Sequence, residues 1–151
     1  MADQKIKARF IEPMLLQRTE NLPQGSSYLY ELKLDGYRAE AIKSGGQLYL
    51  RSRNDKDFKS KYPAIVQALA ALPEETVIDG EVIAFDELGR PSFNALQNHG
   101  SSTGRLFYYA FDVMILAGQD MMNEPLTARR ELLRAHVLPR LCEPIRESAE
   151  L

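Results

Sequence analysis

A lysine in an alternating run of apolar and charged residues is the first side chain in this 151-residue sequence whose surroundings suggest chemistry. Lys33 lies in E-L-K-L-D-G-Y-R, at positions 31–38. Period-two geometry places Glu31 and Lys33 on one face of a strand and Leu32 and Leu34 on the other. A lysine held beside a tight turn can act as a nucleophile when it exposes a neutral amine. The competing interpretation is a solvated lysine next to an ordinary Asp-Gly turn.

Three other segments carry side chains suited to binding a nucleotide. Arg51 and Arg53 lie at the end of a predicted strand, where guanidinium groups can fork onto phosphate. Glu81 interrupts an apolar run and needs a metal ion or a sugar hydroxyl as partner, unless it faces solvent. The run 107–111 offers an aromatic ring that can stack on a nucleobase, although core packing accounts for most of these rings. Each segment taken alone leaves the structural explanation open.

The elements that must position these residues are strands joined by short helices. Apolar periodicity and turn residues predict strands over 28–34, 37–43, 47–52, 76–85 and 106–115, and helices over 63–72, 93–97 and 128–136. Asp35-Gly36 predicts a hairpin turn, and Asp79-Gly80 a turn or bulge. Ser92 and Thr127 are the predicted caps of the last two helices. Residues 1–25 read as extended or irregular, and the whole order predicts an α+β domain with mainly antiparallel pairing.

The composition fits one soluble globular domain. Lysine and arginine number 19 against 21 acidic residues, and 44% of the chain is hydrophobic, which excludes a collagen, a mucin-like stalk and a wholly disordered chain. The single cysteine, Cys142, excludes a disulfide framework and fits a reducing compartment. No apolar run reaches membrane-spanning length, so we expect a cytoplasmic protein with no membrane partner. The net charge of −2 predicts weak binding to nucleic acid, even though basic residues gather at 51–61.

Seven short motifs follow one another in a characteristic order. They are P-M-L at 13–15, E-L-K-L-D-G-Y-R at 31–38, S-R-N-x-x-D-F at 52–58, D-G-E-V-I-A-F-D at 79–86, G-R-P-S-F-N-A-L-Q at 89–97, Y-Y-A-F-D at 108–112 and P-L-x-x-R-R at 125–130. In this combination the sequence resembles the adenylation domain of ATP-dependent DNA ligases, most of all the ligase domain of bacterial ligase D, which serves non-homologous end joining. The resemblance implies an ATP-grasp-like fold with mainly antiparallel sheets and flanking helices.

In that family the lysine of K-x-D-G attacks the α-phosphate of ATP, which forms a lysyl-adenylate and releases pyrophosphate. The adenylate then passes to a 5′-phosphate at a DNA nick, and the 3′-hydroxyl displaces AMP. The matching positions imply Lys33 as the nucleophile, Glu31 beside the adenine with Leu32 next to it in the nucleotide site, and Phe111 stacked on the adenine. They also imply that Arg38 lies near the ribose or phosphates and that Arg53 contacts the nucleotide or the nick phosphate. Glu81 would bind the ribose hydroxyl or a divalent metal. Mg²⁺ is the expected metal, with Mn²⁺ as the alternative.

The sequence also departs from the family pattern. The later E-G-hydrophobic-hydrophobic-x-K and K-x-K motifs are not present, nor is the oligonucleotide-binding-fold domain. We therefore expect residues 1–151 to form the N-terminal part of the adenylation domain and the isolated chain to leave nicks unsealed. The expected partners are nicked or broken double-stranded DNA, weakly bound, and end-joining repair proteins. Two alternatives stay open: an RNA ligase or mRNA-capping-type nucleotidyltransferase, and a non-catalytic nucleotide-binding fragment.

Overall fold

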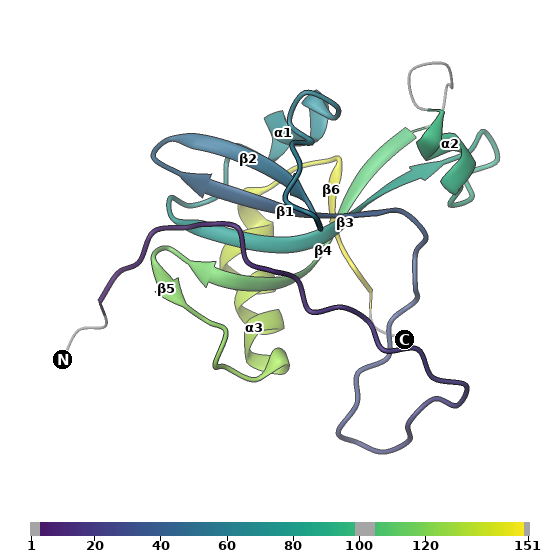
Figure 1. The fold of residues 1–151 in the computed structure, drawn as a ribbon, viewed down its shortest axis with the longest axis horizontal. Helices are drawn as coiled ribbons and strands as arrows, with labels where there is room; N and C mark the ends of the chain where they lie inside the picture. Colours follow the sequence, from purple (N-terminus) through teal and green to yellow (C-terminus); the bar gives the residue numbers. More distant parts are fainter. Residues whose placement is uncertain (1–3, 99–104, 150–151) are drawn as a thin grey trace.

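One six-stranded sheet forms the centre of the molecule in a computed structural model that describes residues 4–98 and 105–149 (Figure 1). The strands are β1 (Tyr37–Ser44), β2 (Gln47–Ser52), β3 (Thr76–Phe85), β4 (Arg105–Leu116), β5 (Gln119–Asp120) and β6 (Ile145–Glu147). The order β2-β1-β3-β4-β5 is antiparallel throughout, and β6 pairs in parallel with β4. The predicted α+β class with mainly antiparallel pairing is therefore confirmed.

Short helices flank the sheet: α1 (Pro63–Leu69), α2 (Phe93–Gln97) and α3 (Leu126–Leu132), the last continuing through the π-helical turn η1 (Leu133–Val137) and the 3₁₀ turn η2 (Leu138–Arg140). Ser92 caps α2 as predicted, because its hydroxyl accepts a hydrogen bond from the Ala95 N–H at 3.1 Å. The predicted cap at Thr127 is wrong. Pro125 occupies the N-cap position, so Thr127 lies inside the first turn. No helix among the described residues has the length and apolarity needed to cross a membrane.

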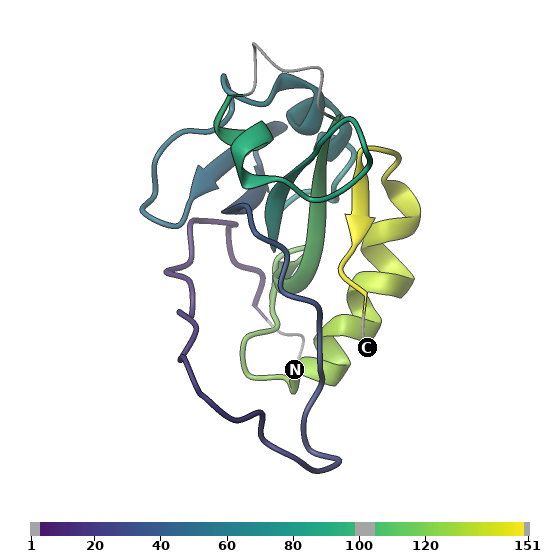
Figure 2. The same cartoon turned by 90° about the vertical axis from the view of Figure 1, so that its right-hand side faces the viewer.

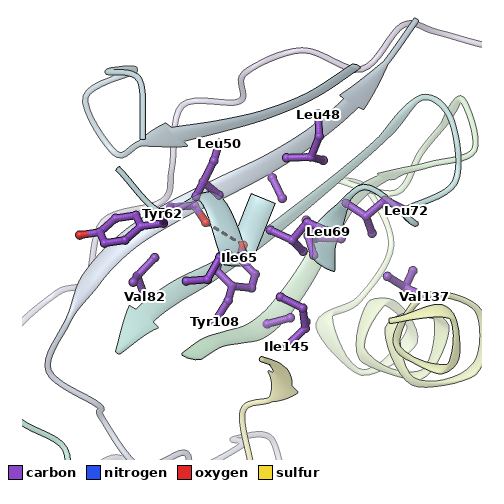
Figure 3. Close-up of a cluster of buried hydrophobic side chains, with 14 of the residues drawn as sticks. Leu48, Leu50, Tyr62, Ile65, Leu69, Leu72, Val82, Tyr108, Val137 and Ile145 are labelled. Atoms are coloured by element: carbon purple, nitrogen blue, oxygen red, sulfur yellow. Dashed lines mark hydrogen bonds between the residues drawn. The ribbon is translucent and has the colours of Figure 1, made fainter. Parts of the chain in front are cut away.

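The sheet buries apolar side chains on both faces. The larger core gathers residues of β1–β4 with α1 and η1, including Ile65, Leu69 and Val137 (Figure 3). On the opposite face a smaller core joins Ile42, Val77 and Ile115 to Ala8, with Phe10 packed against them. Figure 2 shows the irregular N-terminal segment along one side of the sheet and α3 along the other. The second face is thus covered by a segment without secondary structure of its own.

The bulge predicted in β3 is present. The pairing of β3 with β4 shifts register between Asp79 and Gly80. A Cβ at Gly80 would lie 2.5 Å from the Tyr108 ring and from the Tyr109 carbonyl oxygen, so only glycine fits against β4 here. Gly80 faces the larger core, and alternation along the strand turns Asp79 and Glu81 toward the opposite face.

The predicted strand over 28–34 is wrong, and so is the hairpin at Asp35-Gly36. Residues 4–36 form no helix or strand, and only Glu31 makes a single bridge. The reason is that a hairpin would have to pair this run with β1, both of whose edges are already occupied by β2 and β3. The lysine motif therefore leads into β1 as a connection without regular secondary structure.

Candidate active site

The glycine of the K-x-D-G run lies against the backbone of β3. A Cβ at Gly36 would stand 2.1 Å from the Val82 carbonyl oxygen and 2.7 Å from Ile83 Cδ1. Its backbone is not in the left-handed region, so the close approach and not a turn geometry requires glycine. This contact fixes the distance between the lysine segment and β3. Lys33 lies three residues earlier in the same segment, where it is exposed.

Four charged side chains lie on the sheet surface next to this contact, and we call Arg38, Glu40, Asp79 and Glu81 the charged face. In the pairing of β1 with β3, Arg38 stands opposite Glu81, and Glu40 opposite Asp79. Arg38 binds Asp79 diagonally, with Nη2 to Oδ2 at 2.7 Å, and the Asp79 side chain is only 4% exposed. Cross-strand neighbours on one face interact directly, so the two strands form one charged surface.

Two more residues of β4 extend the charged face. The Arg38 guanidinium lies 5.5 Å from the centre of the Phe111 ring, within the range of a cation–π contact. Asp112 stands opposite Asp79 in the pairing of β3 with β4 and binds Arg129 of α3 at 2.8 Å. A ring and several charges thus converge where β1, β3 and β4 run side by side.

Burial sets the protonation of this surface. It raises the pKa of Glu81 to about 6, while the nearby charge of Lys33 acts to lower it. Burial also raises the pKa of Asp79, against the opposing hydrogen bond from Arg38. It raises the pKa of Glu40 to about 7, and the Ile11 N–H bond works in the opposite direction. Lys33 contributes the largest charge effect on the pKa of Glu81, so the two side chains lie in the same region of the molecule.

The irregular N-terminal segment is tied to the sheet by hydrogen bonds from and to its backbone. The Ile11 N–H donates to Glu40 Oε1 at 2.9 Å, and Arg38 Nη1 donates to the Met14 carbonyl. Further back, the Ala8 N–H donates to Glu75 Oε2 at 2.6 Å. Two members of the charged face therefore hold the segment that leads toward Lys33.

A buried arginine of α3 connects the lysine segment to β4. The Arg130 side chain is 1% exposed and forms an ion pair with Glu31, two residues before Lys33. It also donates to the Phe111 carbonyl at 2.9 Å and to the Ser148 carbonyl at 2.7 Å. From the sequence, Arg130 had no predicted role beyond its place in P-L-x-x-R-R. That motif was the only available signal, since a helical arginine is ordinarily solvated.

The predicted site residues are not all brought together. Lys33, Arg38, Glu81 and Phe111 share the region of the charged face, and Glu31 joins them through Arg130. Leu32 is 61% exposed and takes part in none of these contacts. Arg53 is exposed in the turn after β2 and contributes to none of the contacts described above.

The fit to a divalent metal is limited to one carboxylate. Residues 4–98 and 105–149 contain no group of three histidine, cysteine, aspartate or glutamate side chains placed to hold a metal ion. Mg²⁺ commonly takes only one or two protein carboxylates and keeps its other ligands from water and substrate phosphates. Glu81, partly exposed at the edge of the charged face, suits that mode.

The fold is that of the ATP-dependent DNA ligase domain. Residues 13–149 match the family described as the ATP dependent DNA ligase domain, and the chain therefore belongs to that family. Over 146 residues it is 38% identical to a multifunctional non-homologous end joining protein LigD of Pseudomonas aeruginosa, covering 94% of this chain and 17% of the relative. A prophage-derived DNA ligase-like protein, LigB, of Bacillus subtilis is 33% identical over 129 residues, which are 83% of this chain and 47% of the relative.

Solved ligase structures share the fold. The ligase domain of Mycobacterium tuberculosis LigD superposes with a TM-score of 0.67 at 31% identity, covering 82% of this chain and 40% of that one. A mycobacterial DNA ligase D described as complexed with ATP and MES gives the same values. The resemblance read from the motifs is thus confirmed. The chain spans less than half the length of each of these relatives.

Proposed function

We propose that this chain supplies the nucleotide-accepting part of a DNA ligase and that Lys33 accepts AMP from ATP. The observation that carries the proposal is the packing of Gly36 on Val82, because it holds the K-x-D-G lysine near Glu81 and the charged face. DNA 5′-phosphate ends are the proposed final acceptor of the AMP, which the similarity to a non-homologous end joining protein supports. Nicked or broken DNA and end-joining proteins are its proposed partners.

The proposed first step is a phosphoryl transfer to nitrogen. The neutral amine of Lys33 attacks the α-phosphorus, a P–N bond forms, and the bond to the bridging oxygen breaks. Pyrophosphate leaves and the amine proton passes to solvent. Positioning and charge neutralisation dominate such transfers. In this assignment Arg38 neutralises phosphate charge, Phe111 stacks on the adenine, Glu31 contacts its edge, and Glu81 binds a ribose hydroxyl.

Mg²⁺ bound to the phosphates would neutralise charge on the nucleotide and on departing pyrophosphate. Glu81 is the side chain of the charged face that can offer it an oxygen. Leu32 and Arg53 were assigned to the same site from the motifs. In their present positions both are exposed, so their contacts with nucleotide or nick phosphate stay predictions for the nucleotide-bound form.

The intact mass of the purified chain, before and after incubation with ATP and Mg²⁺, tests the proposal. A gain of one adenylyl group that Lys33→Ala abolishes is the expected signature of a nucleotide-accepting lysine. An adduct that survives in Lys33→Ala would refute the assignment of the nucleophile. Failure of the chain to bind ATP at all, measured by calorimetry, would refute the function itself.

One observation favours a second candidate, nucleotide binding without transfer. Lys33 lies exposed in a segment without secondary structure, and Arg53 stands outside the charged face. Few cations therefore surround the position proposed for the α-phosphate. ATP binding with no adduct would support this candidate, and sealing of a nicked duplex by the isolated chain would contradict it.

A further inference from the structure

We infer that Arg130 is a positioning residue for base recognition, which it controls by holding Glu31 and the backbone of Phe111 in one arrangement. The inference rests on the proposed function, since Glu31 and Phe111 are the two residues assigned to the adenine. One guanidinium bonds to both of them. Arg130 itself is 1% exposed, so it acts on a nucleotide only through these partners.

Glu31 is partly exposed, although its partner Arg130 is buried. Its side chain remains 30% exposed, while the Arg130 guanidinium lies behind it. The Ser148 hydroxyl lies 3.5 Å from the other carboxylate oxygen, so two residues distant in sequence contact this group. Two hydrogen-bonded donors fix both the position and the tilt of a carboxylate.

A fixed carboxylate discriminates between purine bases. Adenine carries an exocyclic amino group that can donate to Glu31, whereas guanine presents a carbonyl oxygen at the corresponding position, which a carboxylate repels. A site built to bind a donor rejects the analogue that lacks it far more strongly than apolar pockets reject size differences. Arg130 therefore sets a preference for ATP over GTP, beyond any contribution to folding.

The arrangement also explains why an arginine is buried here. Its ionised guanidinium is paired with Glu31, and Glu147 lies 3.9 Å away. It further bonds two backbone carbonyls from β4 and from the segment after β6. A buried ion pair of this kind contributes to a defined geometry more than to stability. Lysine cannot reproduce the fork, because its ammonium is a single point of contact.

The test compares ATP and GTP dissociation constants, measured by calorimetry on the whole chain. The variants are Arg130→Met, Arg130→Lys, Glu31→Gln and both double variants, with Arg140→Met as a matched control on an exposed arginine of the same helical run. We expect Arg130→Met and Glu31→Gln each to reduce the preference for ATP about tenfold. The double variant should lose no more than either single one, because both remove the same interaction. Arg130→Lys should recover part of the preference, and Arg140→Met should leave it unchanged.

Each other result is decisive. Equal weakening of ATP and GTP by folded Arg130→Met would show a purely structural role and overturn the inference. So would additive effects of Arg130 and Glu31 variants. If Arg130→Met does not fold, Arg130→Lys with Glu31→Gln gives the same coupling measurement. A wild-type chain that binds ATP and GTP equally would overturn the inference alone, whereas one that binds neither would overturn the proposed function and the inference with it.

Discussion

Replacing Gly36 by alanine tests the contact on which the site depends. The new methyl group would lie 2.1 Å from the Val82 carbonyl oxygen, where contacts below 3.0 Å are essentially never found. Both atoms belong to backbone-fixed positions, so the lysine segment must move away from β3. A displacement of roughly 1 Å in a reacting group can lower a rate about 100-fold. The overpacking itself should lower the free energy of unfolding by about 1–3 kcal/mol.

Two measurements check this expectation. The rate of Lys33 adduct formation should fall about 100-fold relative to wild type. Independently of catalysis, the pKa of Glu81, followed by carboxyl NMR, should rise above its value of about 6 as the charge of Lys33 recedes. Gly45→Ala is the control. It strains a backbone with φ of +57° in open space and costs about 1 kcal/mol without touching the site.

The reasoning would be refuted if Gly36→Ala left both the adduct rate and the Glu81 pKa at wild-type values. It would also fail if Gly45→Ala changed them as much as Gly36→Ala does. In that case general destabilisation, and not displacement of the lysine segment, would explain the loss. The paired variants thus separate a local effect from a global one.

Three other expectations concern the charged face. The pKa of Glu40 is raised from 4.5 to about 7, so Glu40 keeps its proton to higher pH in the folded state than in the unfolded chain, and the free energy of unfolding should fall as pH rises from about 4.5 to about 7. Glu40→Gln should flatten that fall and raise the free energy of unfolding by about 3 kcal/mol at pH 8. Urea unfolding at each pH measures both effects. Lys33→Met should raise the pKa of Glu81 in NMR titration, and an unchanged value would contradict their proximity. Arg38→Met should cost about 3 kcal/mol because it leaves Asp79 buried and unpaired, and Arg38→Met with Asp79→Leu should recover most of that loss.

Local signals were sufficient for the middle of the fold. The strands 47–52 and 76–85 are predicted at the bounds that the structure gives, because alternation and flanking turns are properties of a few neighbouring residues. The same holds for Ser92, whose side chain reaches only three residues along the chain. The bulge at Gly80 was also predictable, since glycine within an apolar strand indicates close approach of another backbone.

Long-range competition explains what the sequence could not predict. The run 28–34 alternates like a strand, but the edges of β1 are taken by segments that follow it in the chain. Strand β6 is only three residues long and pairs with β4 residues that lie more than 30 positions earlier in the sequence, so no local pattern predicts it. Arg130 belongs to the same class. Its partners lie in three distant segments, and helical periodicity says nothing about which charged residue will be buried.

In the candidate site, irregular and regular segments have different roles. Its proposed nucleophile and Glu31 lie on a segment without secondary structure, where fluctuations are least restrained. What restrains them is supplied by regular elements: the backbone of β3 against Gly36 and the guanidinium of Arg130 from α3. Because Gly36 leaves no room for a side chain against β3 and Arg130 is buried, we expect substitutions at either contact to displace the segment that carries Lys33. Sensitivity to substitution should thus be greatest at buried positions of β3 and α3 that never touch the nucleotide, and weaker at exposed neighbours such as Leu32.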